Sequence, residues 1–199
     1  MSKICDYSAP FQKFKEWFDE AQAHKEIIEP TAMCLSTVGE DNKPSSRMVL
    51  LKKYDERGFC FFTNLTSRKG RELKNNKNVA LCLYWGALGR QIRIEGEIEK
   101  VSQKEADDYF ASRRRGSQIG AWASKQSHAM RCWSDFERRL DEFTQEFDDL
   151  QIPRPPFWSG FRVKPQYIEF WQEGEFRIHK REVYKKLAND GWQVQMLYP

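Results

Sequence analysis

The clearest guide to the fold is a series of short β-forming segments between residues 32 and 101. Turn-like stretches at residues 39–43 and 55–58 separate the first three segments, and apolar and polar residues alternate along 92–98 in the last one. Closely spaced strands with short connections are typical of antiparallel meanders and small barrels. We therefore expect strands at residues 32–38, 45–54, 59–63, 79–85 and 91–101.

Helical periodicity marks the segments on either side of these strands. An aromatic face with spacings of three and four begins after Ser8 and Pro10, which predicts an N-capped helix with proline in its first turn. Residues 67–75 are expected to form a second, short capped helix. Apolar spacing between residues 102 and 150 predicts three more helices, ahead of a stiff proline-rich connector. Their expected ranges are 102–112, 117–124 and 132–150.

The C-terminal part returns to a strand pattern after this helical segment. Strands are expected at residues 161–163, 167–171, 176–179, 183–186 and 192–197, the last one after an Asn189-Asp-Gly191 turn. Because the composition does not change along the chain, we expect one domain over residues 1–199, mainly β with flanking helices. Its expected parts are an N-terminal helical flank at 1–25, a helical insertion at 102–150, and C-terminal strands at 159–199 that complete the barrel.

Composition excludes several classes of protein. The 199 residues carry 33 Lys+Arg and 29 Asp+Glu, a net charge of +4, which is far from the one-sided basic composition of many nucleic-acid binders. A hydrophobic fraction of 40% is enough to build a core. The longest apolar stretch, Val79–Leu88, is too short to span a bilayer, and no secretory signal is found, so we expect a cytoplasmic protein. Five scattered cysteines and three histidines favour neither a disulfide framework nor a metal site.

Two cations bracket the apolar strand segment Arg47-Met-Val-Leu-Leu-Lys52. Residues five apart fall on opposite faces of a flat strand, so Arg47 and Lys52 reach one pocket only where the strand bends or twists. Solvated strand ends would give the same pattern.

The segment Phe61-Phe-Thr-Asn-Leu-Thr-Ser-Arg-Lys69 runs from a strand into a helix N-terminus. Free backbone N–H groups and the positive end of the helix dipole favour an anion there. Cations at this position are unfavourable unless an anion offsets them, so Arg68 and Lys69 indicate a phosphate site. A solvated helix start is the alternative.

Three consecutive arginines, Arg113, Arg114 and Arg115, precede a Gly-Ser turn at the start of another predicted helix. This arrangement also suits an oxyanion, and a basic RNA-contacting loop competes with that interpretation.

A fourth segment, from Phe170 to Arg181, has Arg177, His179 and Arg181 at alternating positions next to Trp171. Alternation places these three side chains on one face of a predicted strand. Together with the two candidate phosphate sites, the pattern indicates either one ligand with several anionic groups or two phosphorylated ligands side by side.

In sequence order, the four segments resemble the signature of the pyridoxine/pyridoxamine 5′-phosphate oxidases, an FMN-dependent family. The motifs are R-x-V-L-L-K, F-x-T-N-x-x-S-R-K, S-Q-I-G-A-W-x-S-x-Q-S and E-F-W-Q-x-x-x-x-R-x-H, and the resemblance runs from about Ala9 to Pro199. It implies a split β-barrel that forms homodimers, with FMN bound at the subunit interface.

The resemblance also implies a role for individual residues. Arg177 and His179 would be catalytic and would close over the pyridine ring, while Lys52, Tyr109, Arg113 and Ser117 would bind the substrate phosphate. FMN contacts are implied at Arg47, Met48, Val49, Leu50, Leu51, Lys52, Phe62, Thr63, Arg68, Lys69, Gln91, Gln126, Ser127, Trp171 and Arg181. The implied reaction is oxidation of pyridoxine or pyridoxamine 5′-phosphate by O2 to pyridoxal 5′-phosphate, with release of H2O2.

Two positions depart from the family pattern. Arg114 stands where members usually have proline, and Lys180 stands where they usually have an acidic residue. Three other functions fit parts of the pattern: a split-barrel flavoprotein that oxidises phenazine precursors, a non-catalytic protein that carries flavin or pyridoxal phosphate, and an RNA-binding module.

Overall fold

The computed structural model describes residues 3–188 and 191–199. These residues form one ten-stranded antiparallel sheet and five α-helices. The helices are α1 (Ala9–Ala23), α2 (Arg68–Asn75), α3 (Gln103–Ser112), α4 (Arg115–Ala123) and α5 (Trp133–Glu146). The strands are β1 (Lys3–Cys5), β2 (Ala32–Val38), β3 (Pro44–Leu50), β4 (Lys53–Asp55), β5 (Gly58–Asn64), β6 (Asn78–Trp85), β7 (Arg90–Lys100), β8 (Trp158–Gln172), β9 (Lys180–Lys186) and β10 (Trp192–Leu197).

The long strand β8 organises the sheet. Along the main path the strand order is β1-β10-β9-β8-β7-β6-β2-β3, and β4 and β5 branch from it. Residues 158–163 of β8 pair with β5, residues 167–172 pair with β9, and β7 lies along the other edge of β8 over nearly its whole length. The sheet curls but stays open, since no ladder in the described part of the chain joins β3 to β5. Of the C-terminal strands, β8 alone pairs with a strand from the 32–101 segment.

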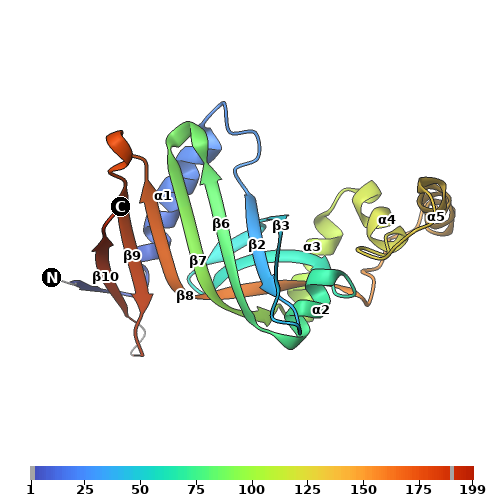
Figure 1. Cartoon of the computed structure of the whole chain (residues 1–199). Coiled ribbons are helices and arrows are strands. Elements are labelled where there is room, and N and C mark those ends of the chain that lie inside the picture. Colours follow the sequence, from blue (N-terminus) through green and yellow to red (C-terminus); the bar gives the residue numbers. More distant parts are fainter. Residues whose placement is uncertain (1–2, 189–190) are drawn as a thin grey trace.

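The main core lies between the sheet and α1, which crosses one face of it (Figure 1). Phe11, Phe14 and Phe18 from α1 pack there against sheet residues such as Phe59. The predicted helix is thus confirmed, but its predicted cap is wrong. Ser8 itself has helical backbone angles, and its hydroxyl donates to Asp6 Oδ1 instead of capping the helix.

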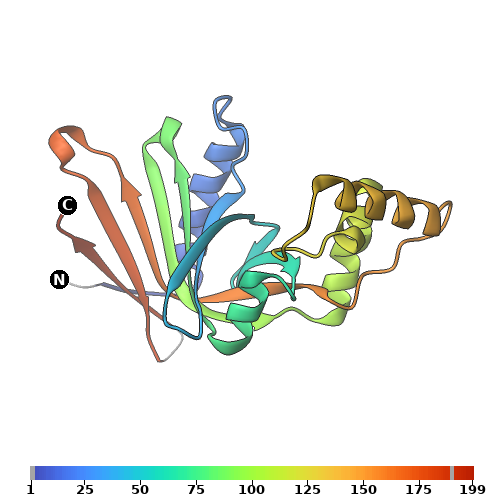
Figure 2. The ribbon, with the colours of Figure 1, turned by 45° about the vertical axis from the view of Figure 1, so that its right-hand side comes forward.

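The helical insertion projects from the opposite end of the sheet from β9 and β10 (Figures 1 and 2). A second apolar cluster, which includes Phe110, Ile119, Phe147 and Trp158, joins α3, α4 and the end of α5 to the start of β8. No residue of α5 itself is buried. The three helices predicted in 102–150 are confirmed, and α5 ends four residues before the predicted boundary.

Several predicted strands have different bounds in the structure. The predicted 45–54 strand breaks at Leu51-Lys52 into β3 and β4, and the two short strands predicted at 161–163 and 167–171 are one strand, β8. Residues 176–179 are not a strand, because the chain forms a 3₁₀ turn at Glu175–Arg177 before β9 starts. Strand β1 was not predicted. Asn189 and Asp190 of the predicted turn lie outside the described residues.

Candidate active site

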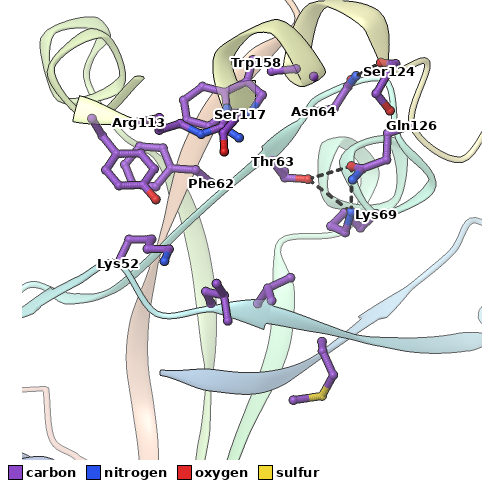
Figure 3. A pocket seen from close by; sticks show the side chains of 16 residues that line it. Lys52, Phe62, Thr63, Asn64, Lys69, Arg113, Ser117, Ser124, Gln126 and Trp158 are labelled. Atoms are coloured by element: carbon purple, nitrogen blue, oxygen red, sulfur yellow. Dashed lines mark hydrogen bonds between the residues drawn. The ribbon is translucent and has the colours of Figure 1, made fainter. Parts of the chain in front are cut away.

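A cavity of about 440 Å³ opens where the insertion meets the sheet (Figure 3). Its walls come from β3, the end of β5, the start of α2, and helices α3 and α4. Three cations, Lys52, Lys69 and Arg113, line it, and among the described residues no Asp or Glu does. The remaining lining residues are Met48, Val49, Leu50, Phe62, Thr63, Asn64, Tyr109, Ser117, Gly120, Ala121, Ser124, Gln126 and Trp158. The cavity therefore combines uncompensated positive charge with flat apolar walls.

Arg113 is the most informative residue of the cavity. It ends α3, and its guanidinium lies over the ring of Trp158, 5.0 Å from the centroid, and near Phe110. Its Nη1 is buried without a hydrogen-bond partner, and burial lowers the pKa of the group. A buried guanidinium N–H that lacks an acceptor is costly. The geometry therefore provides a place for an oxyanion.

Three further polar groups line the cavity with Arg113, among them Lys52 and Ser117 of Figure 3. Ser117 lies in the first turn of α4, and Tyr109 stacks on Phe62 with ring centroids 4.0 Å apart. Lys52 reaches the cavity because the chain bends after β3: the Lys52 backbone N–H donates to the Cys60 carbonyl at 2.9 Å. The structure thus brings together all four residues predicted to bind the substrate phosphate.

A second cationic position lies about Lys69, at the start of α2. Lys69 is only 8% exposed, and its Nζ donates to Thr63 Oγ1 at 3.2 Å and to Gln126 Oε1 at 3.1 Å. Burial, followed by the nearby charge of Arg47, lowers the pKa of the lysine. The Ser67 hydroxyl caps α2 by accepting from the Gly70 N–H at 3.2 Å. This helix start matches the predicted phosphate site.

Arg47 and Arg68 are held beside this position by the buried carboxylate of Glu72. Arg47 Nη2 lies 3.1 Å from one carboxylate oxygen and Arg68 Nε lies 2.9 Å from the other. Burial acts to raise the pKa of Glu72, but hydrogen bonds from Thr37, Ser45 and Arg68 and the charge of Arg47 lower it to about 2. Neither arginine lines the cavity, so Arg47 and Lys52 point to different places despite the bend between them.

Two other predicted FMN contacts lie apart from the cavity. The side chain of Leu51 is buried in the main core, where its backbone N–H donates to the Thr31 carbonyl. Ser127, whose φ is +66°, follows Gln126 and lines a neighbouring hollow.

The remaining predicted residues form a separate group at the far end of the β8–β9 hairpin (Figure 1). Trp171 is paired with Arg181 across one ladder and with Gln91 across the other, and its ring lies 4.6 Å from that of His179. The Gly174 N–H donates to His179 Nδ1 at 3.3 Å, which leaves Nε2 as the protonated nitrogen of the neutral ring.

Arg177 and Arg181 of this hairpin differ in how they are held. Arg181 Nε donates to the buried Glu169 at 2.7 Å, and Glu169 also accepts from Arg93. Arg177 sits in the 3₁₀ turn with a φ of +65° and is exposed. The predicted shared strand face of Arg177, His179 and Arg181 is therefore wrong, although all three lie on the same hairpin.

The sequence interpretation missed two residues that shape the site. Glu72 stands four residues after Arg68, a spacing that favours an ion pair on a helix and offered a signal. Trp158, which supports Arg113, follows the proline-rich connector and carried no comparable signal. Within residues 3–188 and 191–199, no cluster of three or more His, Cys, Asp or Glu could hold a metal ion. None of the helices in these ranges is long and apolar enough to cross a membrane.

Comparisons with known proteins agree with this arrangement. Residues 20–172 match the family model described as pyridoxamine 5′-phosphate oxidase, and residues 158–199 match a pyridoxine 5′-phosphate oxidase C-terminal dimerisation region. A pyridoxine/pyridoxamine 5′-phosphate oxidase of Myxococcus xanthus is 50% identical over 190 residues, covering 96% of this chain and 91% of the relative. An enzyme of the same name from Nostoc punctiforme is also 50% identical, with 96% and 88% covered.

Solved structures show the same fold. PhzG from Burkholderia lata, in complex with tetrahydrophenazine-1-carboxylic acid, has a TM-score of 0.89 at 32% identity and covers 96% of this chain and 92% of its own. An FMN-binding protein related to pyridoxamine 5′-phosphate oxidase, from Nostoc punctiforme, has a TM-score of 0.76 at 15% identity, covering 94% and 97%. The predicted split-barrel fold is thus confirmed, with its sheet open in the described residues.

Proposed function

The chain belongs to the pyridoxamine 5′-phosphate oxidase family, and we propose that it oxidises pyridoxine or pyridoxamine 5′-phosphate to pyridoxal 5′-phosphate. One observation carries the proposal: the buried Nη1 of Arg113 lacks an acceptor in a cavity whose described lining has cations and no carboxylate. Phosphate oxygens are strong acceptors for guanidinium groups. The flat side chains of Phe62, Tyr109 and Trp158 suit a planar ring. A phosphorylated pyridine satisfies both requirements.

In this proposal the substrate phosphate binds to Arg113, Lys52, Ser117 and the Tyr109 hydroxyl. Burial raises the pKa of Tyr109, so the phenol stays protonated at neutral pH and can donate a hydrogen bond. Arg113 and Lys52 supply the charge, while Ser117 adds a hydroxyl from the first turn of α4. The four groups fix the phosphate end of the substrate and hence the position of its ring.

The cofactor in this proposal is FMN, which when bound would supply the redox chemistry, namely hydride removal from the substrate C4′ carbon and reoxidation by O2 with release of H2O2. The residues about Lys69 fit its phosphate. Lys69 is buried among neutral acceptors, Thr63 and Gln126, so its charge has no counter-ion within hydrogen-bond distance. Arg47 and Arg68 stand beside it, held by Glu72. The β3 segment from Arg47 to Lys52, together with Phe62, would border the flavin.

The contribution of the chain to catalysis is to orient the substrate. Two phosphate anchors about one cavity restrict how the two ring systems can lie, and orientation of this kind can lower a barrier by about 7–11 kcal/mol. His179 presents an Nε2–H donor, and Arg177 presents a permanent positive charge beside it. These two groups would close over the pyridine ring and polarise its substituents.

We further propose that the complete site forms between two copies of the chain. The group of Trp171, Arg177, His179 and Arg181 lies on the hairpin at the opposite end of the sheet from the cavity (Figures 1 and 2). Residues 158–199, which match a dimerisation region, carry that group. A homodimer related by a two-fold axis would bring the hairpin of each copy to the cavity of the other.

The decisive experiment measures flavin binding and O2-dependent formation of pyridoxal 5′-phosphate by the purified protein. We expect a yellow protein that turns over pyridoxine or pyridoxamine 5′-phosphate with release of H2O2. A protein that takes up no FMN and forms no product would refute the proposal. Turnover of a phenazine precursor in place of both B6 phosphates would favour the activity of a protein like PhzG, the candidate supported by the 32% identity to that structure. FMN uptake without any turnover would indicate a carrier.

A subunit-mixing experiment tests the shared site. Lys52→Ala and Arg177→Ala are each expected to turn over very little substrate as homodimers at a substrate concentration well below KM, because each change is present in both sites. Mixed after dissociation, equal amounts should recover about a quarter of the wild-type activity, since half the dimers are mixed and each mixed dimer has one intact site. No recovery, with mixed dimers shown to form, would place both residues in sites made by one chain.

The structure gives the arginine cluster little scope for binding RNA. Arg113 points into the cavity, and Arg115 donates to the backbone carbonyls of Leu150 and Phe147. Among the described residues, Arg114 is thus the one member of the cluster without a contact. A single free charge is too little for a salt-dependent nucleic-acid surface.

A further inference from the structure

The tip of the β8–β9 hairpin is an exposed apolar loop in an unusual conformation. Phe176 has a φ of +53° and is 90% exposed, and Ile178 is 69% exposed. A bulky aromatic residue rarely adopts a positive φ, and a conformation of this kind persists where surrounding contacts compensate for it. Within one chain, Phe176 has no buried side to compensate. Glu173 and Glu175 precede Phe176 in the same loop, and Arg177 and Lys180 follow it.

A hollow that could receive exposed apolar side chains lies on the helical insertion. A hollow of about 830 Å³ is formed by the 123–131 loop and the first turns of α5, and we call it the arm hollow. Met130 and Trp133 line it and are 56% and 60% exposed, and Phe136 packs on Trp133 with ring centroids 5.2 Å apart. Other lining residues include the cations Lys125, Arg131, Arg138 and Arg139, and the acids Asp135 and Glu142. The arm hollow thus combines an apolar patch, made by Met130, Trp133 and Phe136, with an excess of positive charge.

The position of the arm hollow relates it to the candidate active site. Ser124 and Gln126 line both the arm hollow and the cavity, so the two are neighbours. The hairpin tip and the insertion lie at opposite ends of one chain (Figures 1 and 2), so they cannot meet within it. In the homodimer, however, the hairpin of a second copy would bring Arg177 and His179 to this cavity. Phe176 directly precedes Arg177 and would arrive beside the cavity, where the arm hollow lies.

We propose that Phe176 and Ile178 of one copy insert into the arm hollow of the other and anchor the strained loop that carries Arg177 and His179. The inference rests on the homodimer of the proposed function and adds to it a specific contact and its purpose. The ring gains apolar contact with Met130, Trp133 and Phe136, and Glu175, next to Phe176, faces a surface of net positive charge. Aromatic side chains buried in a pocket of the partner are typical of residues that dominate binding. Phe176 is in this view a positioning residue for Arg177.

A cross-linking experiment tests the contact directly. Cys132 is exposed and adjoins Trp133 at the start of α5, so Phe176→Cys should place a thiol beside the native Cys132 of the partner. Mild oxidation with copper-phenanthroline should then give a covalent dimer on non-reducing gels. The wild type and the double variant Phe176→Cys/Cys132→Ser should give none, and neither should Ile28→Cys, which is 98% exposed but remote. Absence of the covalent band from a sample that sedimentation shows to be dimeric would overturn the proposal.

A mutant cycle then tests whether the anchor positions the loop. Phe176→Asn removes the ring but keeps a residue that tolerates positive φ, and Trp133→Ser removes the facing ring from an exposed position. Each is expected to weaken dimerisation at least about tenfold and to lower kcat/KM, as loss of a central contact does. The double variant should be no worse than the more damaged single variant. Strictly additive effects, or unchanged dimerisation and kcat/KM in both single variants, would refute the anchor.

The cross-link and the sedimentation measurement require no enzymatic activity. A covalent dimer from a protein that neither binds FMN nor turns over would refute the proposed function and leave the anchor supported. An active flavoprotein dimer without the cross-link would refute the anchor alone.

Discussion

Replacing Arg113 by methionine gives the sharpest test of the substrate site. Methionine keeps an unbranched apolar stem that can pack on Trp158, and it removes the guanidinium whose Nη1 has no partner in the cavity. Because the empty protein gains nothing from that buried N–H, we expect the variant to fold as well as the wild type. Only the complex with a phosphorylated substrate should suffer.

The size of the effect follows from the chemistry of the contact. A hydrogen bond to a charged group contributes about 1.5–3 kcal/mol, and 1.4 kcal/mol corresponds to a factor of ten in binding. Loss of Arg113 should therefore raise KM by about 10- to 150-fold. Lys52, Ser117 and Tyr109 would still hold the phosphate and so orient the ring, so kcat should change little. Lys52 would remain to attract the substrate.

The assay is steady-state formation of pyridoxal 5′-phosphate, with FMN binding and thermal unfolding measured on the same samples. Arg114→Met is the matched control, because Arg114 is adjacent and exposed and has no role in the cavity. The control should behave as the wild type. An unchanged KM for Arg113→Met in a folded, FMN-bound sample would refute the assignment of Arg113 to the phosphate. A large fall in unfolding temperature would contradict the claim that its guanidinium is unpaired in the free protein.

Three further predictions concern other parts of the molecule. Glu72 has a pKa of about 2 against an ordinary 4.5. Its contribution of about 3 kcal/mol to the free energy of unfolding is therefore present above pH 4.5 and is lost as the pH falls toward 2. Acid unfolding monitored by circular dichroism should accordingly be less steep in Glu72→Gln, and an unchanged slope would count against this role. Gly174→Ala should abolish turnover but retain FMN, because the new Cβ would lie 2.1 Å from the Ile178 carbonyl oxygen and displace His179. Flavin titration beside the oxidase assay separates the loss of turnover from any loss of FMN binding. Phe14→Ala should lower the free energy of unfolding in urea by about 3–5 kcal/mol and leave KM unchanged, since Phe14 is fully buried and far from the cavity. A decrease below about 1 kcal/mol would be too small for a core residue.

Local sequence patterns correctly predicted the helices and strands whose tertiary contacts follow the same pattern. The spacing of Trp133, Phe136, Leu140 and Phe143 predicted α5, and alternation predicted β7. The two strands predicted at 161–163 and 167–171 leave a gap at Pro165, a residue type that usually interrupts a strand. Here Pro165 is paired with Gly96 where the ladder register shifts, so β8 continues through the irregularity. That outcome depends on a strand some seventy residues away and is not visible in the local pattern.

The strand predicted at residues 176–179 was wrong for a different reason. The β8–β9 ladder ends where Gln172 pairs with Lys180, so the seven residues between them must form the hairpin connection whatever their own alternation. Gly174 allows the close approach that this connection needs. The motif resemblance predicted residues for the site, but the separation of His179 from Arg113 follows from the topology of the sheet. Motifs preserve the order of residues along the chain and contain no information about which copy supplies each one.

The division of the site has a mechanistic consequence. The cavity of one chain holds cations and aromatic walls but no histidine, aspartate or glutamate among its described lining residues, so it can bind a phosphorylated ring but has few groups to polarise the reacting carbon. His179 and Arg177 are on a strained hairpin that has little support within its own chain. In the proposed dimer, phosphate binding and polarisation of the reacting carbon depend on different ends of the molecule, and association joins them. A separated chain should then bind the phosphate of its substrate and still fail to oxidise it, because in this proposal the residues that close over the ring come from the second copy.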